Sequence, residues 1–152
     1  MIDPQLAAFL EEGLGIHIGA RDERLQPSGT RAVAVKVEDN GLCIVVFIAR
    51  ASINRVLPDL ESNGQAAVVF GRPVDDRSCQ VKGIFVDARP ATAEERQRVT
   101  AQWNGYLQNL ELIGIPRAAA AGWVTWPAVA VRLKVTALFE QTPGPQAGVP
   151  FG

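Results

Sequence analysis

The sequence predicts a mainly β, α+β protein: a small antiparallel barrel with flanking helices. Three observations support this fold class. The 152 residues are enough for one domain with a sizeable core. Strand-like segments outnumber helical ones, and Asp39-Asn40-Gly41 is a strong hairpin signal between two of the early strands. Closing such a sheet on itself buries its apolar face and removes its edges.

In the first half of the chain, short helices alternate with strands. Asp3-Pro4 starts a helix, because the Asp side chain can cap the first turn and proline needs no amide hydrogen there; Gly13 ends it. A helix capped by Ser52 is expected to reach about Asn63, with a kink or restart at Pro58. A polar turn is expected over 21–29. Strands are predicted over residues 14–20, 30–38 and 42–49.

The second half contains one long helix between strands. Thr92 and Glu95 form a capping box at its start, and Gly114 and Pro116 stop it. Its apolar stripe consists of Val99, Trp103, Tyr106, Leu110 and Ile113. Strands are predicted over residues 65–71, 79–88 and 124–139, the last bent near Pro127. With the Pro/Gly-rich tail over 141–152, the whole chain, 1–152, is expected to be a single domain.

Composition narrows the class of protein. The apolar fraction is 47%, the charged fraction 20% and the net charge −1, so the chain is globular and nucleic acid is not its expected partner. We see no secretion signal and no apolar segment of membrane-spanning length, which predicts a cytoplasmic protein with no membrane partner. Cys43 and Cys79 lie in apolar strands and are predicted to be unpaired and buried. No metal-ligand spacing is present.

Two strands carry polar groups that a plain core strand would not need. Gln80 and Lys82 share one face, because strand side chains alternate with period two. Gly83 then removes a side chain, so that another backbone or a flat ligand can come close. An exposed lysine on an edge strand would give the same pattern.

The strand over 30–38 has a cation on each side. Arg31 shares a face with Val33, Val35 and Val37, whereas Lys36 lies opposite, beside two alanines. Both cations can therefore touch one ligand only if a bulge, a barrel bend or a subunit boundary intervenes. A strand with an ordinary solvated face is the alternative.

These motifs give the chain a family resemblance. Arg31-x-Val33-x-x-Lys36 resembles the Arg-x-Val-x-x-Lys of the pyridoxamine 5′-phosphate oxidase-like superfamily, the FMN-binding split barrels. Gln80-Val-Lys-Gly83 resembles the strand that brings a glutamine to the flavin there. The order of helices and strands matches over nearly the whole chain. The ending over 139–148 is similar to that of a small uncharacterised bacterial branch.

The resemblance implies a dimeric split barrel that binds FMN at its dimer interface. Arg31, Lys36, Gln80 and Lys82 would contact the flavin. The segment after the third strand would meet the phosphate through Arg50, Ser52 and Arg55, at the start of a helix. A capped surface helix with solvated arginines is the other interpretation of that segment.

Two functions follow from this resemblance. The first is an FMN-dependent oxidoreductase that acts on a small, unidentified substrate. The alternative is a non-catalytic flavin- or haem-binding module on the same fold, and a barrel with a decayed pocket is a third possibility. His17, the single histidine, could be a proton donor or a haem ligand, but a partnered strand histidine is commoner.

Overall fold

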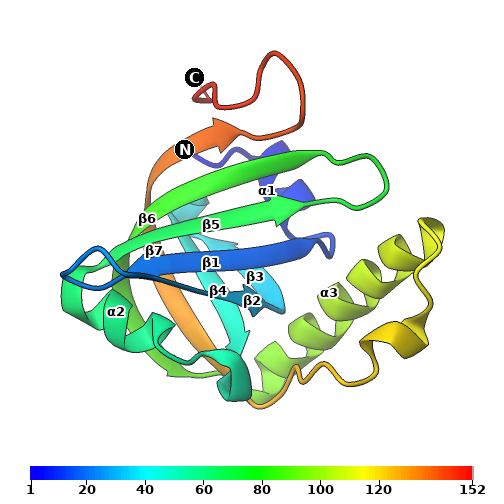
Figure 1. The fold of residues 1–152 in the computed structure, drawn as a ribbon, viewed down its shortest axis with the longest axis horizontal. Helices are drawn as coiled ribbons and strands as arrows, with labels where there is room; N and C mark the ends of the chain where they lie inside the picture. Colours follow the sequence, from blue (N-terminus) through cyan, green and yellow to red (C-terminus); the bar gives the residue numbers. More distant parts are fainter. Residues whose placement is uncertain (152) are drawn as a thin grey trace.

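The computed structural model describes residues 1–151, which form one curled antiparallel sheet with three α-helices around it (Figure 1). The sheet runs in the order β2-β1-β5-β6-β7-β4-β3. The strands are β1 (Gly15–Arg21), β2 (Pro27–Ala32), β3 (Ala34–Glu38), β4 (Cys43–Ala49), β5 (Gln65–Gly71), β6 (Ser78–Pro90) and β7 (Ala128–Glu140). The predicted fold class is confirmed, with seven strands where about six were expected.

The sheet closes into a barrel because β2 and β3, at its two ends, are consecutive pieces of the chain. Only Val33 separates them, and its N–H donates to the carbonyl oxygen of Phe47 on β4 at 2.8 Å. Ala32 and Val35 pack inside the barrel, whereas Val33 and Ala34 both pack on its outside. The prediction of one regular strand over 30–38 is therefore wrong, since the alternation of faces is broken at Val33.

Two hydrophobic clusters stabilise the fold. The larger one fills the barrel and includes Ile16, Val46, Phe70 and Leu133, which are almost completely buried. The helices α1 (Pro4–Leu10) and α2 (Val56–Asn63) add their apolar side chains to it. The smaller cluster lies outside β3, β4 and β7. There the long helix α3 (Ala93–Leu112), on the right of Figure 1, packs through Val99.

The helix termini follow the sequence signals with one exception. Asp3 accepts a hydrogen bond from the Leu6 N–H at 2.7 Å, and Thr92 and Glu95 form the predicted capping box of α3. Ser52, however, does not cap α2: it ends a short 3-10 turn, Arg50–Ser52, and α2 starts four residues later. Pro58 lies in the first turn of α2, where its missing N–H needs no partner, so no kink results.

Side chains from two helical segments cover the free edge of β3. The buried Gln102 amide of α3 accepts from the Val35 N–H at 2.9 Å and donates to the Val35 carbonyl oxygen at 2.7 Å. The Glu11 carboxylate, just after α1, accepts from the Val37 N–H at 2.6 Å. These bonds replace those of a missing neighbouring strand, so β3 offers no bare edge for pairing with another chain.

The long strands β6 and β7 approach each other closely at a bulge. A Cβ atom added at Gly83 would lie 2.8 Å from the Lys134 carbonyl oxygen, and the register shifts between Lys82 and Gly83. The predicted close approach at Gly83 is thus made by another backbone. The final strand starts after Pro127, later than the expected start at residue 124.

The tail returns along the part of β7 that β4 does not cover. The Phe151 N–H donates to the Leu138 carbonyl oxygen at 3.0 Å, and the Glu140 N–H donates to the Val149 carbonyl oxygen at 2.9 Å. The tail therefore protects a second strand edge (top of Figure 1).

Both cysteines are free and buried, as predicted. Burial raises the pKa of the Cys79 thiol to about 12, and the pKa of Cys43 is also raised, chiefly by burial. Neither thiol is therefore ionised to a useful degree near neutral pH. None of the helices described over residues 1–151 is long and apolar enough to cross a membrane.

Candidate functional site

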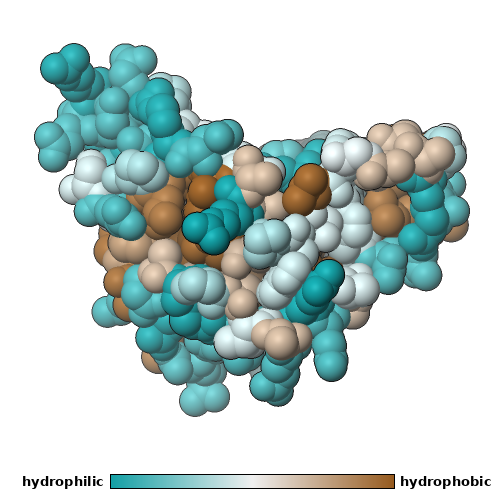
Figure 2. Space-filling model, turned by 90° about the horizontal axis from the view of Figure 1, so that it is seen from below, coloured by the Kyte–Doolittle hydropathy of each residue, from teal (hydrophilic) through white to brown (hydrophobic). Residues whose placement is uncertain are grey.

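The candidate site is the outer face of strands β2, β1, β5 and β6. Two adjoining open hollows lie there, of about 520 and 360 Å³, and they share Gly19 and Ala67. Seen from below, the surface is hollowed between two lobes, on the sides where the β1–β2 loop and α3 lie (Figures 1 and 2).

Strand register arranges the lining residues in two rows. One row crosses the four strands as Arg31, His17, Val69 and Gln80. The next row, two residues along each strand, is Gly29, Gly19, Ala67 and Lys82. The second row is almost without side chains until Lys82, because it consists of two glycines and an alanine. It therefore forms a flat floor on which a planar group can lie against the sheet.

The floor is open above its glycines. A Cβ atom added at Gly19 would come no closer than 3.8 Å to any other residue, and one added at Gly29 no closer than 3.4 Å. Hence the absence of side chains here is not required for packing within the chain. This contrasts with Gly83, where the neighbouring strand fills the space.

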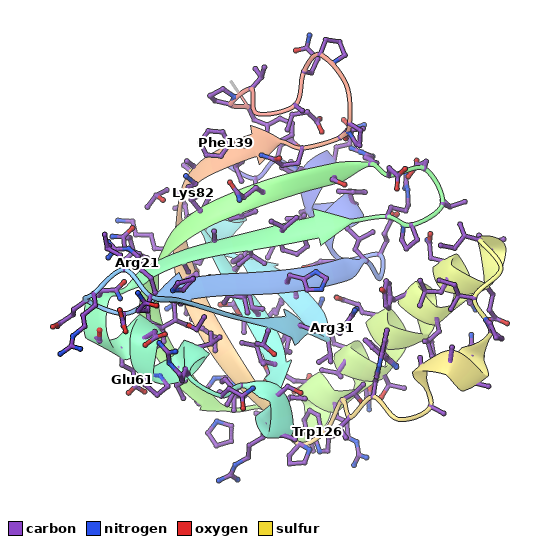
Figure 3. All side chains as sticks on the ribbon, viewed as in Figure 1. Arg21, Arg31, Glu61, Lys82, Trp126 and Phe139 are labelled. Atoms are coloured by element: carbon purple, nitrogen blue, oxygen red, sulfur yellow. The ribbon has the colours of Figure 1, made fainter. Side chains whose placement is uncertain are left out.

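Cations surround these hollows and carboxylates do not. Arg31, Arg21 and Lys82 line them, and within residues 1–151 neither hollow is lined by an Asp or Glu. The ammonium of Lys82 lies 5.2 Å from the centre of the Phe139 ring, on the upper part of the sheet (Figure 3). A flat surface with unneutralised positive charge suits a planar anion.

Arg31 is held by aromatic rings and not by a carboxylate. Its guanidinium donates to the Tyr106 hydroxyl at 3.1 Å and lies 4.2 Å from the centre of the Trp123 ring. No ion pair of Arg31 is found among the described residues. A guanidinium has five N–H donors, and Tyr106 takes one, so the others are free for an anion.

Arg31 also borders a third cavity, of about 270 Å³, between the ends of β2 and β4 and the segment after α3. Ser52, Trp103 and Trp123 line it with Arg31. The Thr30 hydroxyl donates to the Ser52 carbonyl oxygen at 2.8 Å and so ties this turn to β2. Of the three predicted phosphate ligands Arg50, Ser52 and Arg55, Ser52 is therefore the one that shares a cavity with Arg31.

The other cationic residues predicted to bind the flavin lie away from the two hollows. Lys36 does reach the outer side of the barrel, because the break at Val33 reverses the alternation, but it pairs with Glu38 at 3.0 Å. Arg55 pairs with Asp22 at 3.5 Å and with Asp59 at 3.7 Å. Arg50 is exposed on its 3-10 turn. It lines neither of the two sheet-face hollows nor the third cavity beside Arg31.

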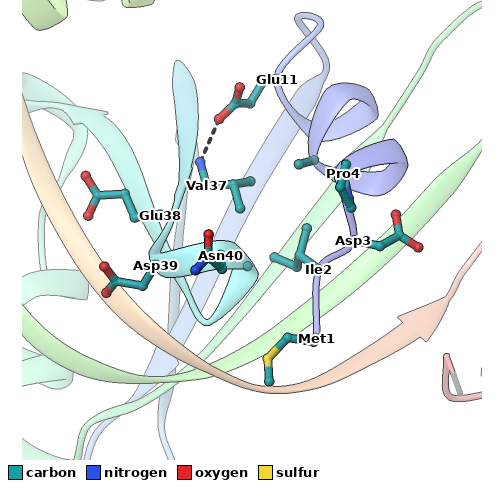
Figure 4. Close-up of a pocket in the computed structure, with 11 residues that line it drawn as sticks. Met1, Ile2, Asp3, Pro4, Glu11, Val37, Glu38, Asp39 and Asn40 are labelled. Atoms are coloured by element: carbon teal, nitrogen blue, oxygen red, sulfur yellow. Dashed lines mark hydrogen bonds between the residues drawn. The ribbon is translucent and has the colours of Figure 1, made fainter.

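A larger cavity, of about 690 Å³, lies elsewhere, between the N-terminus, α1 and the end of β3 (Figure 4). Four carboxylates line it: Asp3, Glu11, Glu38 and Asp39. Each already has a partner, as in the bond from the Val37 N–H to Glu11 drawn in Figure 4. This cavity does not suit an anionic ligand. No cluster of three metal-ligating side chains occurs in residues 1–151.

Sequence reasoning identified Arg31, Gln80 and Lys82 but missed the floor between them. Gly19 lies in a predicted strand, but Gly29 was expected in a polar turn over 21–29, whereas β2 begins at Pro27. The pairing of Gly19 with Gly29 could therefore not be inferred from the sequence. The contact of Arg31 with Tyr106 joins residues 75 positions apart in the sequence, so no local pattern could indicate it.

The comparisons with known proteins concern the fold. No protein-family profile matches the chain, and no curated protein sequence does. An F420 reductase matches with a TM-score of 0.57 and 18% identity, over 89% of this chain and 97% of that one. A candidate pyridoxamine 5′-phosphate oxidase from Lactobacillus delbrueckii matches with a TM-score of 0.55 and 10% identity, over 90% and 91%.

An FMN-binding protein from Syntrophomonas wolfei matches with a TM-score of 0.54 and 11% identity, over 88% of this chain and 82% of that one. At such identities the likeness is one of fold. It confirms the split barrel that the sequence resemblance implied.

Proposed function

We propose that this chain, which has the split-barrel fold of pyridoxamine 5′-phosphate oxidase-like proteins, binds FMN on its outer sheet face. We further propose that it acts as an FMN-dependent oxidoreductase on a small substrate. One observation carries the proposal: Arg31 is held by Tyr106 and Trp123 without a carboxylate partner, at the edge of a flat, cation-lined hollow.

The residues present fit FMN in shape and charge. The floor of Gly19, Gly29 and Ala67 accepts a flat ring, and Gln80 and Lys82 offer hydrogen-bond donors to its polar edge. Arg31 and Ser52 provide donors for a phosphate. From His17 to Arg21 the hollows extend over five residues of β1, which span about 13 Å. FMN supplies the redox chemistry when bound, and the chain binds, orients and tunes it.

The test is titration of FMN into the purified protein, followed by flavin fluorescence and absorption. We expect saturable binding at micromolar FMN in the wild type. Gly19→Val should abolish it, because the new side chain stands on the floor without touching the backbone around it. The melting temperature of Gly19→Val checks that this variant folds.

The absorption spectrum also separates the alternatives. Flavin peaks in the protein as purified, or after titration, support the proposal. A Soret band without flavin binding would favour a haem-binding module and overturn the flavin assignment. Absence of both bands, with no FMN binding at micromolar concentration, would mean that the barrel does not use this face for either group.

We also propose a homodimer with the flavin at its interface. Exposed apolar side chains lie on the strands around the hollows: Val69, Ile84 and Val86. A second copy would bury them and cover one side of the open hollows, and an obligate interface would bury about 2,000 Å² or more. Light scattering at micromolar concentration should give twice the chain mass of 16.3 kDa. A monomer mass would contradict the dimer.

A further inference from the structure

His17 lies in the middle of the candidate site. It is the only histidine of the chain. Its cross-strand partners are Arg31 on β2 and Val69 on β5, and all three line the larger sheet-face hollow. Side chains directly opposite each other on adjacent antiparallel strands have Cβ atoms about 5 Å apart. The imidazole and the guanidinium therefore border the same hollow, and both act on an anion that binds in it.

The imidazole has few charged neighbours. Arg31 faces it from β2, and Tyr106 of α3 reaches the site through its bond to Arg31. The strands β5 and β6 present Val69 and Gln80, which do not titrate. No hydrogen bond within residues 1–151 engages the ring, so its nitrogens are free for a ligand.

This setting favours the neutral ring until an anion arrives. The His17 side chain is exposed, yet surrounding protein atoms partly desolvate it. This partial burial, together with the positive charge of Arg31, lowers the pKa of His17 below its ordinary value of 6.5. A bound phosphate would outweigh both effects, because its negative charge offsets Arg31 and pairs with the imidazolium.

We propose that His17 is a second ligand of the anion-binding site and that it takes up one proton from solvent when a phosphate binds between it and Arg31. This rests on the proposed function, because it places the phosphate of FMN at the Arg31 end of the hollow. The site would then bind phosphate more tightly as the pH falls.

The direction in which the affinity changes with pH follows from the linkage between anion binding and protonation of His17. Between the pKa of His17 in the free protein and its higher pKa in the complex, affinity rises as pH falls, by at most tenfold per unit. Above the higher pKa, affinity no longer depends on this group. A phosphate monoester itself has a pKa near 6. Sulfate, which keeps two negative charges over this range, is therefore the cleaner probe.

The single histidine makes a direct measurement possible. NMR of the imidazole should follow one titration, and the pKa of His17 should move upward when sulfate is added. Arg31→Gln should reduce this movement, because sulfate loses its main partner. Arg24→Gln, in the exposed β1–β2 loop, is the matched control of equal charge change. An imidazole pKa unmoved by sulfate would overturn the proposal.

A binding experiment tests the same point independently. Sulfate affinity, measured by competition with FMN, should rise from pH 7.5 to 5.5 in the wild type, by at most about tenfold per unit, and stay flat in His17→Gln. Equal pH dependence in both proteins would overturn the role of His17 while leaving FMN binding intact. If FMN does not bind at all, the proposed function fails, but the NMR titration with sulfate still decides whether His17 and Arg31 form an anion site.

Discussion

Replacing Gln102 with leucine is expected to lower the free energy of unfolding by about 2–4 kcal/mol. Leucine keeps most of the side-chain volume but removes both hydrogen bonds to Val35, a residue with no exposed surface. The N–H and C=O groups of Val35 would then stay buried without partners, and each such group costs about 1–3 kcal/mol. Urea unfolding followed by circular dichroism measures the loss.

The control lies on the same helix. Gln97 is exposed, and Gln97→Leu makes the same chemical change without touching β3, so the unfolding free energy should shift by less than about 0.5 kcal/mol. Equal effects of the two substitutions would mean that the loss comes from α3 itself and not from the edge of β3. The slope of the transition with urea should remain unchanged, since the folded state keeps its area.

Replacing Arg31 with glutamine is expected to weaken FMN binding by about 10- to 100-fold. A charge-assisted hydrogen bond contributes about 1.5–3 kcal/mol, and each 1.4 kcal/mol is tenfold in affinity. Glutamine keeps a donor for Tyr106 but removes the charge and most of the N–H groups that face the hollow. Flavin fluorescence titration measures the change, and the melting temperature shows whether the variant folds.

The same titration with two other arginines tests where the phosphate binds. Arg24→Gln removes an exposed charge that lines neither hollow and should change the affinity by less than about twofold. Arg55 already pairs with Asp22 and Asp59, so Arg55→Gln should also have little effect. A loss at Arg55 with none at Arg31 would place the phosphate on the segment after β4, as the family resemblance suggested.

The fold was predictable because its signals are local. Thr92 and Glu95 cap α3 in sequence and in space, and the turn at Asp39–Gly41 uses the left-handed backbone that Asn and Gly favour. The break at Val33 was not predictable. Alternating valines in this segment favour one regular strand, and only pairing with both β1 and β4 forces the change of face.

The site was predictable only in part, for a related reason. Gln80 and Lys82 share a face because one strand carries both, and period-two alternation is sufficient to infer that. The prediction that Ser52 caps a helix was wrong, since Arg50 and Ser52 belong to a 3-10 turn before α2 and Arg55 holds the N-cap position. The aromatic partners of Arg31 come from α3 and the segment behind it, which only the closed barrel brings to β2.

The single residue between β2 and β3 also limits how this chain could vary in length. Deleting or adding one residue at Val33 would move every side chain of β3 to the opposite face of the sheet. Lys36 would then point into the barrel and Val35 out of it. Loops such as the one at 72–77 face no such limit. Chains of this fold that descend from a common ancestor should therefore conserve the spacing between Arg31 and Lys36 more strictly than the identity of either residue.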